Sequence, residues 1–260
     1  MCSKRDRIRR LSLKWCWLAR RPVIPPDLVT FSDVRFAWPG SDRFRLVVDH
    51  FALARGERLL LIGPSGSGKS TFLSLLAGIV APDAGQIFVL GTNLGQLKAH
   101  ARDRFRSEHF GIIFQQFNLL PYASVTDNVV LPLSFAAARR ARVTASGGAE
   151  HEARRLLGRL GLDAATIDGG RASNLSVGQQ QRVAAARAMI GAPELIVADE
   201  PTSSLDRNTQ MAFLDLLFAD LDAAGTTLIM VSHDETLASR FSRVARLDEF
   251  ARVERGGAST

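Results

Sequence analysis

The sequence predicts an α/β protein in which a layered sheet carries an inserted helical subdomain. Residues 58–62, 194–198 and 227–231 form short apolar runs, which are typical of strands buried on both faces. Between the first two runs, residues 125–190 have a mostly helical pattern. Strands of this kind need a covering layer on each face, so the alternation indicates a layered α/β domain with the helical middle as an insertion.

The elements follow one another along the chain without an internal repeat or a low-complexity tract. We expect strands at 28–31, 46–48, 58–62, 87–90, 111–114, 194–198 and 227–231. We expect helices at 71–79, within 125–190 and at 208–223, with a polar, glycine-containing break near 144–148.

The positive charge lies almost entirely in the first 27 residues. The chain has 33 Lys and Arg residues against 26 Asp and Glu residues, a net charge of +7. Residues 1–27 hold eight basic and two acidic residues, which leaves 25 basic and 24 acidic residues for the rest. A nearly neutral body argues against nucleic-acid binding, so no nucleic-acid partner is expected.

Residues 1–27 read as a basic, disordered extension. Arg9 and Arg10 resemble part of a twin-arginine export signal, but the apolar stretch that follows spans only residues 15–19. A signal needs about 7–15 apolar residues, which excludes export. Weak contact with an anionic membrane surface remains the alternative for this segment. No apolar run approaches the ~18 residues of a membrane span, and two cysteines make no disulfide framework.

Residues 63–70, here called the phosphate loop, match the pattern G-x-x-x-x-G-K-[ST] between a predicted strand and a predicted helix. Glycines let backbone N–H groups turn around phosphate oxygens, and the helix N-terminus attracts the same anion. Lys69 would bridge the β- and γ-phosphates, and the Ser70 hydroxyl would bind Mg²⁺. The expected nucleotide-binding residues here are Gly63, Pro64, Ser65, Gly66, Ser67, Gly68, Lys69, Ser70 and Thr71.

Two carboxylates, Asp199 and Glu200, stand at the end of the run 194–198. A buried strand that delivers a carboxylate beside a phosphate loop predicts a Mg²⁺ ligand, and Asp199 takes that role. Glu200, one residue later, is placed to act as general base on an attacking water, so hydrolysis needs no covalent intermediate. A solvated acidic turn is the alternative for an isolated pair of this kind.

A third motif, Leu-Ser-Val-Gly-Gln at residues 175–179, resembles the signature of the ATP-binding cassette (ABC) transporter ATPases. That signature usually reads Leu-Ser-Gly-Gly-Gln, so Val177 replaces the first glycine, and we expect the loop to tolerate it. The resemblance implies that Ser176, Gly178 and Gln179 face the γ-phosphate held by a second subunit. Two subunits would then sandwich two ATP molecules.

The other family motifs occur in the family's order. By resemblance, Gln115 contacts Mg²⁺ and water and relays to the membrane partner, with Gln116 as a competing choice. Asp206 lies in the loop that crosses the dimer interface, and His233 contacts the γ-phosphate. Trp38 corresponds to the aromatic residue that stacks on adenine, with ordinary packing as its alternative.

The resemblance implies a P-loop NTPase fold, with a RecA-like core, an antiparallel β subdomain and an inserted α-helical subdomain of ABC type. The expected division is an extension at 1–27, an ATP-binding domain at 28–250 with its helical subdomain at about 116–185, and a tail at 251–260. Segments within 110–133 are similar to the lipoprotein-releasing and macrolide-exporter subfamily.

The implied function is that of an ATP-hydrolysing subunit, using ATP and Mg²⁺, that powers a separate permease. It would act as a homodimer or pseudo-dimer, peripheral to the cytoplasmic face of the inner membrane. An amino-acid importer ATPase and a cell-division ATPase remain alternatives. The 106 residues between Ser70 and Ser176 leave no room for the coiled coils of DNA-repair relatives, and the single phosphate loop excludes a two-cassette ribosomal ATPase. A P-loop kinase would explain Lys69 but not the signature.

Overall fold

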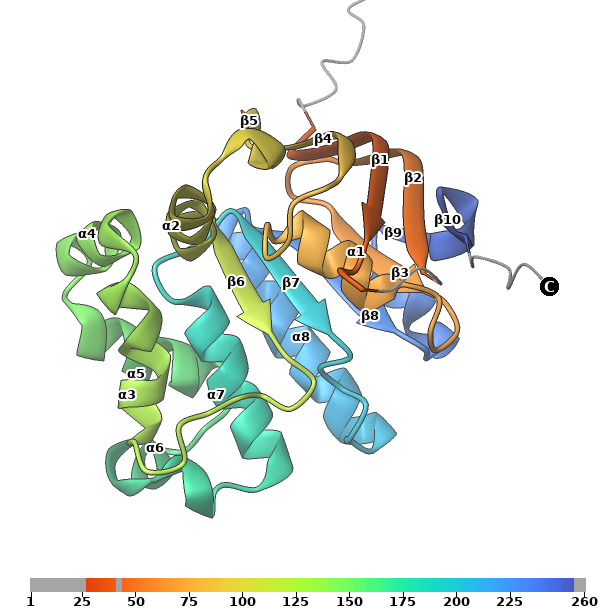
Figure 1. Ribbon diagram of the computed structural model, residues 1–260. Helices are drawn as coiled ribbons and strands as arrows, with labels where there is room; N and C mark the ends of the chain where they lie inside the picture. Colours follow the sequence, from red (N-terminus) through yellow and green to blue (C-terminus); the bar gives the residue numbers. More distant parts are fainter. Residues whose placement is uncertain (1–26, 41–43, 255–260) are drawn as a thin grey trace, which may run out of the picture.

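The computed structural model describes residues 27–40 and 44–254. The expected extension therefore lies outside the described residues, apart from Asp27. Two five-stranded sheets and a group of helices make up the described chain (Figure 1).

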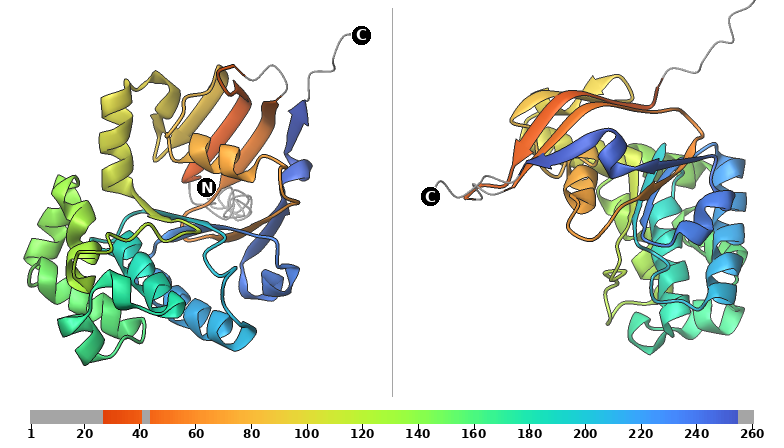
Figure 2. Two further views of the ribbon diagram at one scale, coloured as in Figure 1. Left: turned by 60° about the horizontal axis from the view of Figure 1, so that its bottom comes forward. Right: turned by 90° about the vertical axis from the view of Figure 1, so that its right-hand side faces the viewer.

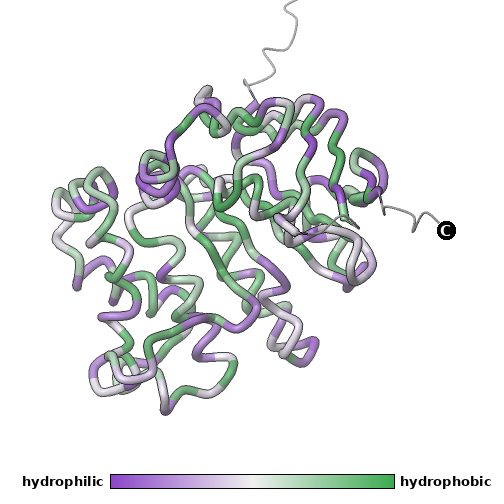
Figure 3. The backbone as a smooth tube through the Cα atoms, viewed as in Figure 1, coloured by the Kyte–Doolittle hydropathy of each residue, from purple (hydrophilic) through white to green (hydrophobic). Residues whose placement is uncertain are grey.

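The central sheet is parallel and supplies the ends on which the site is built. Its order is β6 (Phe110–Ile113), β7 (Leu195–Asp199), β8 (Thr227–Ser232), β3 (Arg58–Ile62) and β9 (Arg243–Arg246). The three apolar runs of the sequence become β3, β7 and β8, and they lie at the centre, where the green segments of Figure 3 mark hydrophobic residues. Carboxyl ends of parallel strands meet at one edge, which brings distant loops together.

The second sheet is antiparallel and covers one side of the central sheet (Figure 2). Its order is β10 (Ala251–Glu254), β2 (Arg45–Leu53), β1 (Val29–Ala37), β4 (Ala84–Val89) and β5 (Thr92–Asn93). Helix α1 (Lys69–Leu76) packs into the core between the sheets. The Phe72 ring lies 4.9 Å from the Phe31 ring and 5.1 Å from the Phe51 ring, so an aromatic cluster fixes α1 against this sheet.

The helices α3 to α7 gather at the other side of the molecule (Figure 1). They are α3 (Val125–Val130), α4 (Ala137–Ala145), α5 (Ala149–Arg159), α6 (Ala164–Gly169) and α7 (Val177–Met189), and α2 (Ala99–His109) and α8 (Arg207–Ala224) complete the helices. Short 3₁₀ turns are η1 (Leu94–Gln96), η2 (Leu131–Ser134), η3 (Ala172–Asn174), η4 (Glu235–Arg240) and η5 (Leu247–Glu249). One continuous core joins these helices to the central sheet, so the subdomain is packed onto the strands.

Two expected boundaries differ from the structure. Residues 251–254 belong to β10, which pairs with β2 from Ala251 opposite Val48 to Glu254 opposite Arg45, so the expected tail at 251–260 begins with an edge strand. Four residues are too few to produce a recognisable alternation in the sequence. The expected end of the helical subdomain at 185 falls inside α7, which is one continuous helix.

Candidate active site

The phosphate loop joins β3 to α1 at the carboxyl edge of the central sheet. Gly66 and Gly68 have left-handed backbones, with φ of 74° and 103°. Gly68 is also the N-cap of α1 and offers no capping side chain, so the first N–H groups of the helix are left for another acceptor. A loop of this shape requires glycine at both positions and presents a concave row of donors.

Lys69 lies inside this concavity and is only 8% exposed. Its Nζ donates to the carbonyl oxygens of Gly63, at 2.6 Å, and Pro64, at 2.9 Å. The Ser67 Oγ is buried and has no hydrogen-bond partner among the described residues. The site thus combines the Lys69 ammonium, the unpaired Ser67 hydroxyl and the N–H groups at the start of α1. Donors of this kind fit a polyphosphate group.

Asp199 reaches the phosphate loop from the end of β7. The Ser70 Oγ donates to its Oδ2 at 3.3 Å. Burial raises the pKa of Asp199, and neighbouring Glu200 raises it further, against the opposing effects of Ser70 and Lys69. A hydroxyl and a half-buried carboxylate are hard oxygen donors, so this pair fits Mg²⁺, which takes one or two protein ligands and completes its shell with phosphate and water.

Glu200 and His233 form the second pair at this edge. His233, which follows β8, places its Nδ1 3.2 Å from the Oε2 of Glu200. The Glu200 backbone is left-handed, with φ of 45°, and its N–H donates to the carbonyl of Val231 at 3.1 Å. A strained backbone held by its neighbours often marks a functional position, and here it directs a carboxylate beside the Asp199 site.

Gln115 and Gln116 both lie in the exposed turn after β6, the strand next to β7. The turn thus lies at the same edge as Asp199, although no geometry distinguishes the two glutamines. Trp38 is tied to the start of α1: its Nε1–H donates to the Thr71 Oγ1 at 3.2 Å. One side of the indole meets the Phe36 ring edge-on at 5.1 Å, while the side chain stays 40% exposed.

The signature residues form a separate cluster at the start of α7. The Ser176 Oγ accepts a hydrogen bond from the Gln179 N–H at 3.3 Å, and the Gln179 Oε1 accepts one from the Ser176 N–H at 2.9 Å. Val177 is the first helical residue, 47% exposed and outside the left-handed region, so this position does not require glycine. Gly178 lies near Leu205, in the loop before α8.

Asp206 is the N-cap of α8 and accepts hydrogen bonds from the N–H and Oγ1 of Thr209, at 3.0 and 2.6 Å. These bonds lower its pKa, so the carboxylate stays ionised at the helix start. Among the described residues, no hydrogen bond joins the signature cluster or Asp206 to the phosphate loop. The chain therefore brings Lys69, Ser70, Asp199, Glu200 and His233 to one edge and leaves the signature apart from them.

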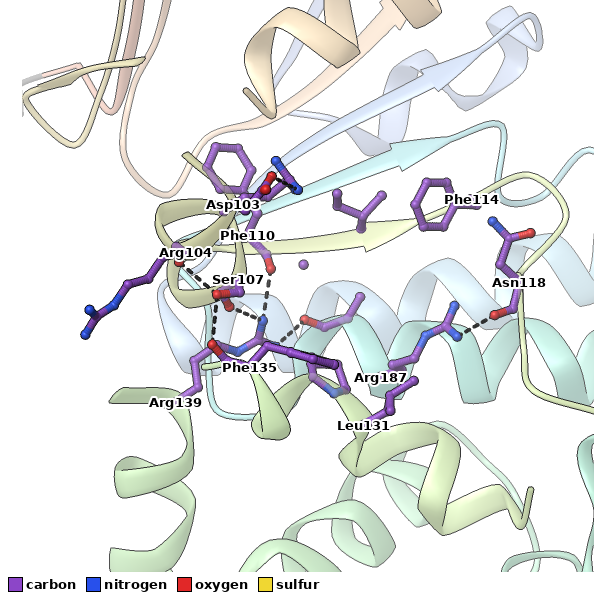
Figure 4. Close-up of a pocket in the computed structure, with 15 residues that line it drawn as sticks. Asp103, Arg104, Ser107, Phe110, Phe114, Asn118, Leu131, Phe135, Arg139 and Arg187 are labelled. Atoms are coloured by element: carbon purple, nitrogen blue, oxygen red, sulfur yellow. Dashed lines mark hydrogen bonds and ion pairs between the residues drawn. The ribbon is translucent and has the colours of Figure 1, made fainter. Parts of the chain in front are cut away.

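Two buried arginines, Arg139 on α4 and Arg187 on α7, were not expected from the sequence. Both line a groove of about 670 Å³ between β6 and the helical subdomain, and their guanidinium groups bind backbone carbonyls (Figure 4). The other groove residues are Asp103, Arg104, Arg106, Ser107, Phe110, Gly111, Ile112, Phe114, Asn118, Leu131, Pro132, Phe135 and Ala188. An arginine inside the Ala-rich stretch 183–190 was the available signal.

Residues 48–203 match the family model described as "ABC transporter". The chain is 44% identical over 193 residues to an uncharacterised ABC transporter ATP-binding protein, YbbA of Escherichia coli, covering 74% of this chain and 81% of that one. It is 38% identical over 199 residues to the lipoprotein-releasing system ATP-binding protein LolD of Paramagnetospirillum magneticum, covering 76% and 84%.

The macrolide export ATP-binding/permease protein MacB of Burkholderia thailandensis is 37% identical over 224 residues, which are 85% of this chain and 33% of that longer protein. Among solved structures, the dimeric ATP-binding cassette MJ0796, in a post-hydrolysis state bound to ADP and Pi, superposes with a TM-score of 0.70. It is 31% identical and the match covers 84% of this chain and 93% of that one.

The fold predicted from the sequence is confirmed by this likeness. Within the part of the chain that the structure describes, no helix is both long enough and apolar enough to cross a membrane. The extent of the family match and the identity to these relatives place the chain plainly: it belongs to the ABC transporter family, as an ATP-binding subunit that hydrolyses ATP.

Proposed function

We propose that this chain is the peripheral ATPase subunit of an exporter or lipoprotein-releasing type of transporter, and that it drives a separate permease from the cytoplasmic face of the inner membrane. The observation that carries the proposed chemistry is the contact between His233 Nδ1 and Glu200 Oε2, which are 3.2 Å apart. Glu200 directly follows Asp199, whose carboxylate accepts the hydrogen bond of Ser70. The names of LolD and MacB support the transporter type over an importer or a cell-division ATPase.

Each residue at the edge has a role that its position supports. Lys69 and the N–H groups of the phosphate loop bind the β- and γ-phosphates. Ser70 and Asp199 would hold Mg²⁺, which would supply positive charge to neutralise the phosphate oxygens. Glu200 accepts the proton of the attacking water, while His233 holds the Glu200 carboxylate in place and approaches the γ-phosphate. Gln115 positions the water from the neighbouring strand.

A second copy of the chain completes the site in this proposal. Ser176, Gly178 and Gln179 lie away from the phosphate loop of their own chain, so they reach a γ-phosphate only across a dimer. The dimeric MJ0796 cassettes support this arrangement. The α7 N-terminus then adds its partial positive charge to the transition state, and Asp206 lies at the interface.

The groove beside β6 is the proposed docking place of the permease. Phe114 and Phe135 are exposed there, and Arg104 and Arg106 also line it. The groove is lined by residues of β6 and of the turn that carries Gln115, and this turn also lies at the carboxyl edge of the central sheet. A permease segment bound in the groove would therefore contact the element that positions the water. The transported molecule would be a lipoprotein or another hydrophobic substrate, by the names of the relatives.

Mixed dimers test the shared site. In a Glu200→Gln background, one chain carries Lys69→Ala and the other Ser176→Arg, and occluded ATP is counted per dimer. In the proposed dimer, each ATP site combines the phosphate loop of one chain with the signature of the other. Lesions on different chains therefore fall in the same composite site and leave the other intact, so one ATP per dimer is expected. The control places both lesions on one chain, which damages both composite sites, and no ATP is expected. The reverse pattern would show that each site is built within one chain.

A further inference from the structure

The turn that carries Gln115 contains two consecutive residues in a backbone conformation that side chains disfavour. Phe117 and Asn118 have φ of 58° and 50°, and neither is glycine. The left-handed region brings Cβ close to the carbonyl oxygen, so two such residues in succession need an external restraint. Internal bonds of the turn are short-range: the Phe117 N–H donates to Phe114 O at 3.0 Å, and the Asn118 N–H to Gln116 O at 2.6 Å.

Arg187 supplies a restraint from α7. Its Nη1 donates to the carbonyl of Asn118 at 2.7 Å (Figure 4). Its Nη2 donates to the carbonyl of Phe117. The side chain is 8% exposed, and among the described residues it forms no ion pair with a carboxylate. The guanidinium is therefore committed to the two carbonyls of the left-handed pair.

The planar fork of arginine suits this contact, because two parallel N–H groups meet two adjacent acceptors at once. Lysine offers a compact ammonium on a flexible stem, without the planar fork, and would hold the two carbonyls less rigidly. Arg187 also lies eleven residues after Ser176 on the same helix, about 16 Å along the axis of α7. One rigid element thus joins the signature to the turn of Gln115.

We propose that Arg187 is a positioning residue that holds the Gln115 turn in its left-handed form and ties it to the signature helix. Movement of the α7 N-terminus, where a partner's ATP is proposed to bind, is then transmitted to the residue that places the water. This inference rests on the proposed role of Gln115 and adds a link that neither Gln115 nor Ser176 provides alone.

Hydrogen–deuterium exchange across residues 113–121 of the ATP-free chain tests the restraint directly. In Arg187→Met, exchange at 115–119 is expected to be about tenfold to a hundredfold faster, because a charged donor to two carbonyls is lost. Arg187→Lys is expected to fall between Arg187→Met and the wild type. The matched control is Arg182→Met. Arg182 lies on the same helix, and its Nη1 donates to the Gly161 carbonyl at 3.3 Å. This substitution should leave the exchange rates at residues 115–119 unchanged.

ATP turnover gives the functional readout. Arg187→Met is expected to lower kcat about tenfold or more, since a small misplacement of a positioned group has that effect, while KM for ATP stays within about twofold. Adding Asn118→Gly should restore part of both the protection and kcat, because glycine adopts the left-handed backbone without strain. A loss of folded protein alone would not be rescued in this way.

Two results would overturn the proposal. One is an exchange rate at residues 115–119 that stays within about twofold of the wild type in both Arg187 variants. The other is an exchange rate in Arg187→Met that rises equally over residues 115–119, α7 and the central strands, which would indicate general destabilisation. Gln115→Ala, measured in parallel, separates this from the proposed function. Wild-type turnover in Gln115→Ala would remove the role of Gln115, while the exchange result would still decide whether Arg187 holds the turn.

Discussion

Replacing Arg139 by methionine should destabilise the ATP-free chain severely. Arg139 is 1% exposed and donates to the carbonyls of Ile190, Ala188 and Phe110, and also to that of Ser107. It thereby joins α4 to the end of α7 and the start of β6. Burial lowers its pKa to about 10, so the guanidinium is still charged at neutral pH.

The magnitude follows from the acceptors that would be left without a donor. Methionine keeps the apolar stem but removes the arginine donor from three carbonyls in the core, at about 1–3 kcal/mol each before relaxation. Relaxation and water entry reduce the sum, which gives an expected loss of about 3–5 kcal/mol in the free energy of unfolding. That is a large part of the ~5–15 kcal/mol that holds a typical domain together.

Urea denaturation of Arg139→Met and of Arg140→Met provides the measurement. Arg140 is the next residue on α4, is exposed, and donates to the Leu133 carbonyl at 2.9 Å. Its replacement should cost less than about 1 kcal/mol, as surface substitutions usually do. A loss below about 1 kcal/mol for Arg139→Met, or equal losses for the two variants, would refute the reasoning.

Three further outcomes are expected. Asp199→Asn should abolish turnover by removing the proposed Mg²⁺ ligand, and it should raise the melting temperature near neutral pH, because burial disfavours the ionised carboxylate and raises the pKa of Asp199. The folded wild type gains stability as it binds that proton, so the difference in melting temperature should shrink as the pH falls toward the ordinary aspartate value of 3.8, and an unchanged difference would contradict this. Trp38→Ala should weaken ATP binding about tenfold and Trp38→Phe should not, if the exposed ring face stacks on adenine, whereas equal weakening would point to the lost Thr71 contact. Deleting residues 1–27 should leave ATPase activity intact, and lost activity would show that the segment matters.

The sequence determines the central sheet well because its strands are buried on both faces. Continuous apolar runs predicted β3, β7 and β8. These strands define the edge of the sheet at which Lys69 and Asp199 lie. Helix α2 has no fully buried residue, so it lacks the apolar stripe that would have predicted it. In β1 the alternation is interrupted by a bulge between Ser32 and Arg35, which hid the second half of the strand.

Within the site, motif spacing could identify the carboxylates but not their contacts. Glu200 and His233 are 33 positions apart in the sequence. Both follow predicted strands, so they could be expected at the same edge of the sheet, but their direct contact could not be predicted. The position of Arg187 in an Ala-rich stretch could mark it as unusual, but its partners could not have been assigned, because they are backbone carbonyls 69 and 70 residues away. Backbone carbonyls exist at every position, so no residue pattern marks the ones that an arginine will bind.

ATP retention by Glu200→Gln tests the account most directly. The variant keeps Lys69, Ser70, Asp199 and the signature but replaces the proposed base with a side chain that cannot accept the water's proton. With MgATP, light scattering should report a dimer, and the nucleotide recovered from it should be unhydrolysed ATP. Turnover at the wild-type rate, or a chain that stays monomeric with ATP bound, would contradict the account.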